Sequence, residues 1–139
     1  MEIISSLNEI EHAAKKIILL INKYNIFAFT GELGAGKTTF IASICKLLGV
    51  PETVTSPTYS LIQEYQVGEN KIIYHLDLYR IKSNEEAADA GVEDCLYSNE
   101  LCFVEWPEKA PLLFPDSTVY IFFQILSDDK RKLIVQLPQ

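Results

Sequence analysis

The chain has 139 residues, of which 48% are hydrophobic, so it is long enough to bury the core of a single domain spanning residues 1–139. Its formal charge is −7, and only two of its basic residues, Arg80 and Arg131, are arginines. Because nucleic-acid phosphates are bound by clustered Lys and Arg, this composition predicts a poor binder of nucleic acid, and any role with RNA would need a basic partner.

The N-terminal stretch predicts a helix. Ser6-Leu7-Asn8-Glu9 has the pattern of a capping box, with a hydroxyl at the first position and a carboxylate three residues later. An apolar stripe with helical spacing follows and ends near Tyr24-Asn25. Its members are Ile10, Ala13, Ala14, Ile17, Ile18 and Ile21.

Residues 31–38, Gly-Glu-Leu-Gly-Ala-Gly-Lys-Thr, match the phosphate-binding loop (P-loop) pattern. The apolar run 26–30 before them reads as a buried strand. Residues 39–48 after them have helical spacing, and Gly49 is a plausible stop. The motif therefore stands between a strand and a helix, which is the context that its chemistry requires.

The residue types of this loop suit a nucleotide triphosphate. Glycines let consecutive backbone N–H groups turn inward around an anion, and a helix N-terminus adds unpaired N–H groups. Lys37 is expected to reach the β- and γ-phosphates, and the hydroxyl of Thr38 to ligate Mg²⁺.

Residues 50–59 are rich in hydroxyls, contain two prolines and predict a loop. In nucleotide switches, a loop at this place senses the γ-phosphate. Thr58, or Thr55 and Ser56, can donate a hydroxyl to the phosphate or metal, and an ordinary Ser-Pro turn is an equal alternative.

The next segments predict strands and a mixed sheet. Residues 59–65 and 71–78 read as strands joined by a turn at 66–70, so that they form an antiparallel hairpin. A last hairpin is predicted from residues 118–126 and 132–137. Between the two hairpins, residues 83–90 begin as a capped acidic helix that Gly91 can end.

Two acids stand at predicted strand ends. Asp77 closes the apolar run 72–77, and Glu105 closes the run 101–105. Such an acid orders Mg²⁺ in nucleotide hydrolases, and a second one can hold a metal-bound or attacking water. The pattern leaves open which of the two touches the metal. Trp106, the only tryptophan, follows Glu105 and can stack on a base, contact a partner or simply pack.

The three cysteines, Cys45, Cys95 and Cys102, lack the spacing of a metal site. Cys45 and Cys102 lie in apolar segments and are expected to be core residues. No signal peptide or membrane span is predicted, because acidic residues interrupt the N-terminus and no apolar run is long enough. Reduced thiols together with a nucleotide loop favour a cytoplasmic protein.

Four pieces in this order, 31–39, 56–59, 75–80 and 105–108, resemble the bacterial TsaE family, the ATPase of tRNA threonylcarbamoyladenosine biosynthesis. The P-loop is common to many families, whereas His75-Leu76-Asp77-Leu78-Tyr79-Arg80 and Glu105-Trp106 are more specific. The resemblance covers essentially the whole chain. It implies a P-loop NTPase-like, three-layer α/β/α fold with a mixed parallel and antiparallel central sheet.

The resemblance also implies a function. The chain is expected to bind ATP and Mg²⁺, to hydrolyse ATP weakly alone, and to act with TsaB and TsaD, which transfer threonylcarbamoyl to adenosine 37 of tRNA. It is expected to meet tRNA only through these partners, to have no membrane association and to be a monomer alone.

The residue roles carried over are catalytic for Lys37, Asp77 and Glu105, and metal-binding for Thr38 and Glu105. Residues around Ser5 to Asn8 are expected to border the adenine. The expected nucleotide-binding residues are Glu32, Leu33, Gly34, Ala35, Gly36, Lys37, Thr38, Thr39, Thr58 and Trp106.

Two other functions remain open from the sequence. A nucleotide-gated scaffold would use binding, without hydrolysis, to order the loop at residues 53–59. A small-molecule kinase would transfer the γ-phosphoryl group, but such enzymes usually surround that group with several arginines.

Overall fold

The computed structural model describes residues 1–51, 54 and 61–139. In these residues the strands are β1 (Glu2–Ser6), β2 (Ile26–Thr30), β3 (Ile62–Val67), β4 (Lys71–Asp77), β5 (Leu101–Glu105), β6 (Val119–Ile125) and β7 (Lys130–Gln136). The α-helices are α1 (Ile10–Ile21), α2 (Lys37–Leu47), α3 (Asn84–Asp89) and α4 (Val92–Leu96), and short 3₁₀ turns are η1 (Leu7–Glu9), η2 (Pro107–Lys109) and η3 (Pro111–Leu113).

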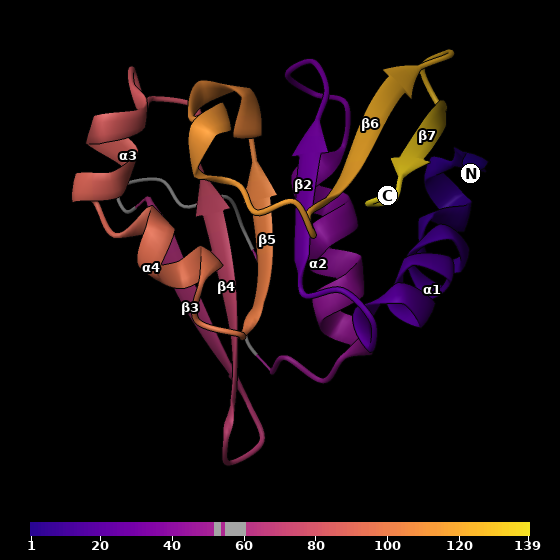
Figure 1. The fold of residues 1–139 in the computed structure, drawn as a ribbon. Coiled ribbons are helices and arrows are strands. Elements are labelled where there is room, and N and C mark those ends of the chain that lie inside the picture. Colours follow the sequence, from indigo (N-terminus) through magenta and orange to yellow (C-terminus); the bar gives the residue numbers. More distant parts are fainter. Residues whose placement is uncertain (52–53, 55–60) are drawn as a thin grey trace.

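The strands form one mixed sheet (Figure 1), which in the described residues has seven strands in the order β1-β7-β6-β2-β5-β4-β3. The four middle strands β6, β2, β5 and β4 are parallel to one another. Antiparallel strands extend both sides, with β3 on β4 and β7 with β1 beyond β6. The parallel strands β2, β5 and β4 therefore end at the same edge of the sheet, and a site can be assembled there.

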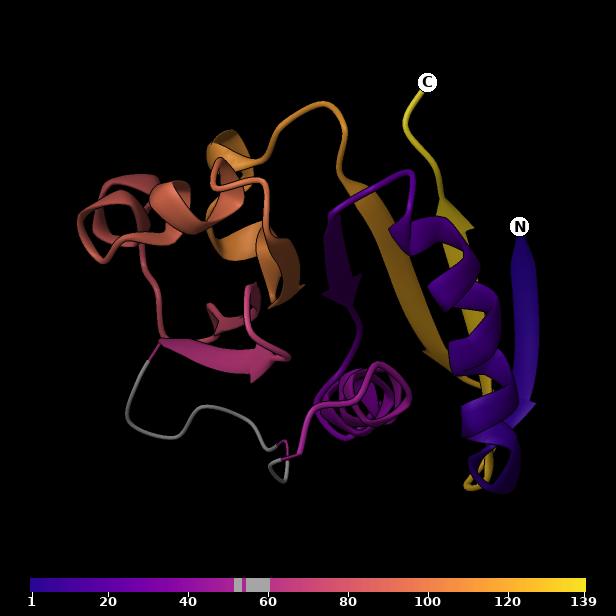
Figure 2. The same cartoon turned by 90° about the horizontal axis from the view of Figure 1, so that it is seen from below.

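Helices cover both faces of the sheet, as Figure 2 shows, and this confirms the expected layered α/β fold. One core packs α1 and α2 on β2, β5 and β6 through residues such as Ile17, Phe40, Phe27 and Phe103. The other core packs α3 and α4 on β2, β5 and β4. This second layer covers only part of its face, because Ile4 on β1 and Phe122 on β6 are 66% and 36% exposed.

The beginning of the chain differs from the sequence prediction. Residues 2–6 form strand β1, which pairs with β7 (Ile3 opposite Leu133), and the α-helix begins only at Ile10. The hydroxyl of Ser6 bonds the carboxylate of Glu9 at 2.8 Å and caps no backbone amide. A five-residue strand whose partner lies at the other end of the chain leaves little local signal, and the capping pattern was therefore misread.

The remaining elements lie close to their predicted places. Helix α2, the β3–β4 hairpin, α3, β5 and the β6–β7 hairpin are all present, and Ser83 caps α3 by accepting from the amide of Glu86. Helix α4 was not predicted, because Gly91, in the left-handed region at φ +95°, separates it from α3 and it spans only five residues. Cys45 and Cys102 are buried in the core, as expected. Among helices of the described residues, none is long and apolar enough to cross a bilayer.

Candidate active site

The P-loop runs from the end of β2 to the start of α2, and its glycines meet specific steric needs. Gly34 and Gly36 have φ values of +80° and +99°, a backbone region that side chains with a Cβ disfavour. A Cβ on Gly31 would lie 2.9 Å from the Cβ of Phe123 on β6. Arg131 on β7 donates from Nε to the carbonyl of Ala35 at 2.9 Å, so the last hairpin fixes the outer side of the loop.

Lys37, the first residue of α2, is only 5% exposed. Its ammonium donates to the carbonyl of Gly31 and lies 3.5 Å from the centroid of the Trp106 ring. Burial lowers the pKa of Lys37, and the carboxylates of Glu105, Glu108 and Asp77 partly oppose this shift. A cation that has lost much of its water gains strongly from an anionic ligand, because few waters screen their attraction.

Sheet register brings the two strand-end acids together. Asp77 on β4 is paired with Glu105 on β5, which is in turn paired with Phe29 at the end of β2. Their side chains lie on the face where α2 packs, because Phe103, two residues before Glu105, belongs to that core. Both acids therefore face the side of α2, and Glu105 contacts its first turn through Thr38.

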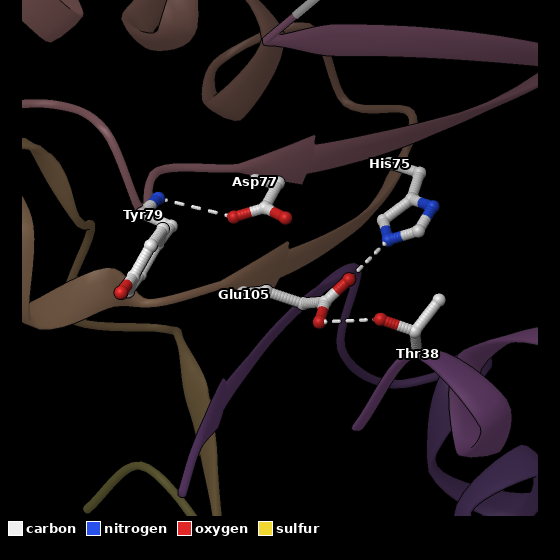
Figure 3. Close-up of polar contacts among 5 residues, drawn as sticks. All are labelled: Thr38, His75, Asp77, Tyr79 and Glu105. Carbon is white, nitrogen blue, oxygen red and sulfur yellow. Dashed lines mark hydrogen bonds and ion pairs between the residues drawn. The ribbon is translucent and has the colours of Figure 1, made fainter. Parts of the chain in front are cut away.

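Glu105 is 3% exposed and both its oxygens are engaged (Figure 3). Oε1 accepts from the hydroxyl of Thr38 at 2.8 Å, and Oε2 lies 2.7 Å from Nε2 of His75. A buried carboxylate needs such partners, since an unpaired one would lose its hydration without compensation. The Thr38–Glu105 contact joins the P-loop helix to β5.

Asp77 lies closer to the surface than Glu105. Its Oδ1 accepts from the backbone N–H of Tyr79 at 3.0 Å. Burial raises the pKa of Asp77, the Tyr79 hydrogen bond lowers it, and the charge of Glu105 raises it again. A cation placed between or beside two neighbouring carboxylates offsets the repulsion between their charges.

These groups line one cavity of about 260 Å³. Its walls are the six residues from Leu33 to Thr38 together with Asp77, Tyr79, Glu105 and Trp106. The ring of Tyr79 lies 5.0 Å from that of Trp106, so two aromatic side chains stand together at the cavity wall. The cavity thus combines an amide-rich loop and a cation with a hydroxyl–carboxylate pair.

The donor set fits Mg²⁺. Thr38 and Glu105 offer hard oxygen ligands, and Asp77 adds a carboxylate to the same cavity. Mg²⁺ usually takes one or two carboxylates and fills its remaining positions with waters and phosphate oxygens. The described residues contain no group of three or more His, Cys, Asp or Glu that could hold a metal ion.

Most of the predicted site residues lie around this cavity. Glu32 lines an adjoining opening with Trp106 and Glu108, whereas Thr39 is exposed on α2 and lines neither space. Thr58, with its alternatives Thr55 and Ser56, lies outside the described residues. Ser5, Ser6 and Leu7 border a small apolar hollow beside Gly36, and the adenine contact stays a prediction.

Sequence reasoning gave no role to three residues that the structure places here. His75 and Tyr79 belong to the motif at 75–80, and their pattern was the available signal. Arg131 lies 96 residues from its partner Ala35 and had no local signal.

The chain from residue 4 to residue 133 matches the family model described as threonylcarbamoyl adenosine biosynthesis protein TsaE. A tRNA threonylcarbamoyladenosine biosynthesis protein TsaE from Rickettsia bellii is 38% identical over 130 residues, which are 93% of this chain and 89% of the relative. The protein of the same name from Treponema pallidum is 34% identical over 116 residues, 84% of each chain.

Among solved structures, the fold is similar to the crystal structure of YdiB from Bacillus subtilis, with a TM-score of 0.76 and 24% sequence identity. The match covers 100% of this chain and 86% of YdiB, and at this identity it supports the fold alone. The match to the family model includes the P-loop and both strand-end acids. The chain therefore belongs to the TsaE family of tRNA threonylcarbamoyladenosine biosynthesis proteins.

Proposed function

We propose that this chain is a Mg²⁺-dependent ATPase that supports threonylcarbamoylation of tRNA in the cytoplasm, together with the partner proteins TsaB and TsaD. The observation that carries the proposal is that buried Lys37 and the Thr38–Glu105 pair line the same cavity as the P-loop. A cation, a glycine-rich loop at a helix N-terminus and paired oxygen ligands within one space match what a triphosphate with its metal needs.

Each residue has a role in this proposal. The loop amides and the N-terminus of α2 bind the phosphates, and Lys37 neutralises the β- and γ-phosphate charge. Thr38 and Glu105 hold Mg²⁺, which when bound draws charge from the phosphate oxygens. Asp77 orients a water through the carboxylate that the Tyr79 amide anchors.

The charge of the protein bears on its partners. A formal charge of −7 disfavours direct binding to tRNA, so the contact with tRNA is expected to be made by the partner proteins. The exposed Leu33 and Tyr79, 67% and 45% accessible beside Trp106, offer apolar contact area next to the nucleotide. A partner seated there would sense whether the cavity is filled.

Hydrolysis is favoured over phosphoryl transfer to a metabolite. The chain has two arginines, and neither lines the described cavity. Arg80 is exposed, and the guanidinium of Arg131 is bound to the backbone of Ala35, Ser127 and Lys130. Kinases rely on such cations to stabilise the transferring group.

The test is phosphate release from ATP by the purified chain, alone and with TsaB and TsaD, measured with malachite green. We expect slow Mg²⁺-dependent release alone and faster release in the complex, and loss of both in Glu105→Gln. Bound ATP that is never hydrolysed in either state would overturn the ATPase assignment.

A second experiment separates hydrolysis from nucleotide gating. Glu105→Ala is introduced into cells that depend on this protein for threonylcarbamoyladenosine. Failure to complement supports hydrolysis as the required step. Full complementation by a variant that binds ATP and the partners but does not turn over would show that the protein is a nucleotide-gated scaffold.

A further inference from the structure

His75 is a fully buried polar residue on β4, between β3 and β5, and the proposed function above gives it no role. It lies on β4 with 0% exposure, and its ring centroid is 6.3 Å from that of Tyr65 on β3. Burying an imidazole costs free energy unless its nitrogens find partners. A purely apolar side chain would fill this space at lower cost, so the polar atoms of His75 need an explanation.

The contact that His75 makes is with Glu105. Its Nε2 lies 2.7 Å from Oε2, while the other carboxylate oxygen accepts from Thr38 at 2.8 Å. The three side chains come from β4, β5 and α2, and the Glu105 carboxylate lies between the other two, as Figure 3 shows. Among the described residues, Nδ1 of His75 has no hydrogen-bond partner.

The chemistry of the two groups sets the direction of this hydrogen bond. A carboxylate that binds a cation is ionised and can only accept hydrogen bonds. The proton between the two groups must then belong to Nε2 of His75. Nε2 is therefore the donor and Oε2 the acceptor in this contact.

We propose that His75 is the positioning residue for Glu105. It donates from Nε2 to Oε2, and so holds Oε1 beside the hydroxyl of Thr38, where the proposed function places Mg²⁺. This inference rests on that function for its consequence, but the hydrogen bond itself can be tested without it.

Backbone register alone does not hold the Glu105 carboxylate in place. Pairing of β5 with β4 and β2 places the Cα of Glu105, but three side-chain torsions still separate the backbone from the carboxylate. The ammonium of Lys37 lies in the same cavity and attracts the carboxylate of Glu105. A donor behind Oε2 counters that pull and reduces the rotamer entropy that metal binding would otherwise have to remove.

His75 does not fit the role of a metal ligand. Its Nε2 is directed at Oε2 of Glu105, and it is fully buried beneath the cavity, whose lining does not include it. We therefore expect its effect to pass entirely through Glu105.

The first test is the tautomer of His75 in the nucleotide-free protein, read from the nitrogen chemical shifts of ¹⁵N-histidine. The chain has only two histidines, and His12 is exposed on α1, so His12→Gln leaves the signals of His75 alone. We expect a proton fixed on Nε2 and hydrogen-bonded to the carboxylate of Glu105. An Nε2 that carries no proton, or rapid averaging between the two tautomers, would overturn the proposal. This result does not depend on whether the protein hydrolyses ATP.

The second test compares His75→Gln with His75→Leu, and uses His12→Gln as the matched control. Glutamine keeps an N–H donor near the place of Nε2, whereas leucine fills space without one. Nucleotide affinity is measured with a fluorescent ATP analogue, with and without Mg²⁺, and kcat and KM are measured in parallel.

We expect His75→Leu to weaken apparent Mg²⁺ affinity and kcat by about 10–100-fold, the range known for residues that orient metal ligands. Nucleotide affinity without Mg²⁺ and the KM for ATP should stay within about twofold, a change of about 0.4 kcal/mol. His75→Gln should recover a large part of the loss. Equal losses in folded His75→Gln and His75→Leu, or equal losses with and without Mg²⁺, would overturn the positioning role. If neither variant folds, the position of the His75 proton in the wild-type protein tests the positioning role. Wild-type protein that shows the expected tautomer but no Mg²⁺-dependent binding would instead refute the proposed function.

Discussion

Gly31→Ala tests whether the first residue of the P-loop is glycine because of space. A Cβ at this position would lie 2.9 Å from the Cβ of Phe123, 3.1 Å from the Phe123 carbonyl oxygen and 3.4 Å from the Cβ of Ala35. Ordinary contact begins near 3.4 Å, so Phe123 must recede by about half an ångström. The carbonyl oxygen and the Cβ of Phe123 cannot move by a rotamer change, because the first is a backbone atom and the second is bonded directly to the backbone.

The strand that carries Phe123 is held on both sides. Strand β6 pairs with β2, where Thr30 lies opposite Phe122, and with β7, where Leu133 lies opposite Phe123. Overpacking of this kind costs about 1–3 kcal/mol. For a chain of this size we expect the melting temperature to fall by about 4 °C per kcal/mol, or about 4–12 °C. The loop itself must also shift, and we expect ATP affinity to fall about tenfold, or about 1.4 kcal/mol.

The assays are thermal and denaturant unfolding and titration with a fluorescent ATP analogue. Gly68→Ala in the β3–β4 turn is the matched control, since its Cβ would meet nothing within 4 Å and only its φ of +67° resists the change. That backbone strain costs about 1–2 kcal/mol and leaves ATP affinity unchanged. A Gly31→Ala protein as stable as the wild type, with unaltered ATP affinity, would refute the steric argument.

Three further predictions concern the cavity. Burial lowers the pKa of Lys37 below 10.5, so the unfolded chain keeps a proton that the native protein releases, and the unfolding free energy should rise with pH in that window. Lys37→Met should abolish that rise in pH-dependent denaturation and should also abolish ATP binding; an unchanged pH dependence would contradict the assignment. Burial raises the pKa of Asp77 above 3.8, so the native protein holds its proton more tightly and stability should fall as pH increases through the raised pKa. Asp77→Asn should therefore make the nucleotide-free protein more stable near pH 7 in urea unfolding while abolishing phosphate release, and a loss of stability would show this reasoning to be wrong. Trp106 is the only tryptophan and lies over the Lys37 ammonium, so ATP binding should change its fluorescence as Lys37 turns to the phosphates, and constant emission at saturating ATP would argue against that movement.

The P-loop and the elements beside it could be predicted because their signals are contiguous. Residues 26–48 contain, one after another, the apolar run, the glycines, Lys37 and the helix. Local preferences set the backbone there. The strand-end acids were predictable for a related reason, since an acid after an apolar run marks the end of a buried strand. Their position at one edge followed from the parallel order of β2, β5 and β4.

The sequence by itself thus determined the P-loop, the two acids and the family. Tertiary structure decided what these groups touch, because the deciding contacts join distant parts of the chain. Thr38 meets Glu105 across 67 residues, His75 meets Glu105 across 30, and Arg131 meets Ala35 across 96. No local propensity encodes such pairs, which depend on strand order and register. For the same reason β1 was not predicted, and His75 received no role until its buried ring was seen beside Glu105.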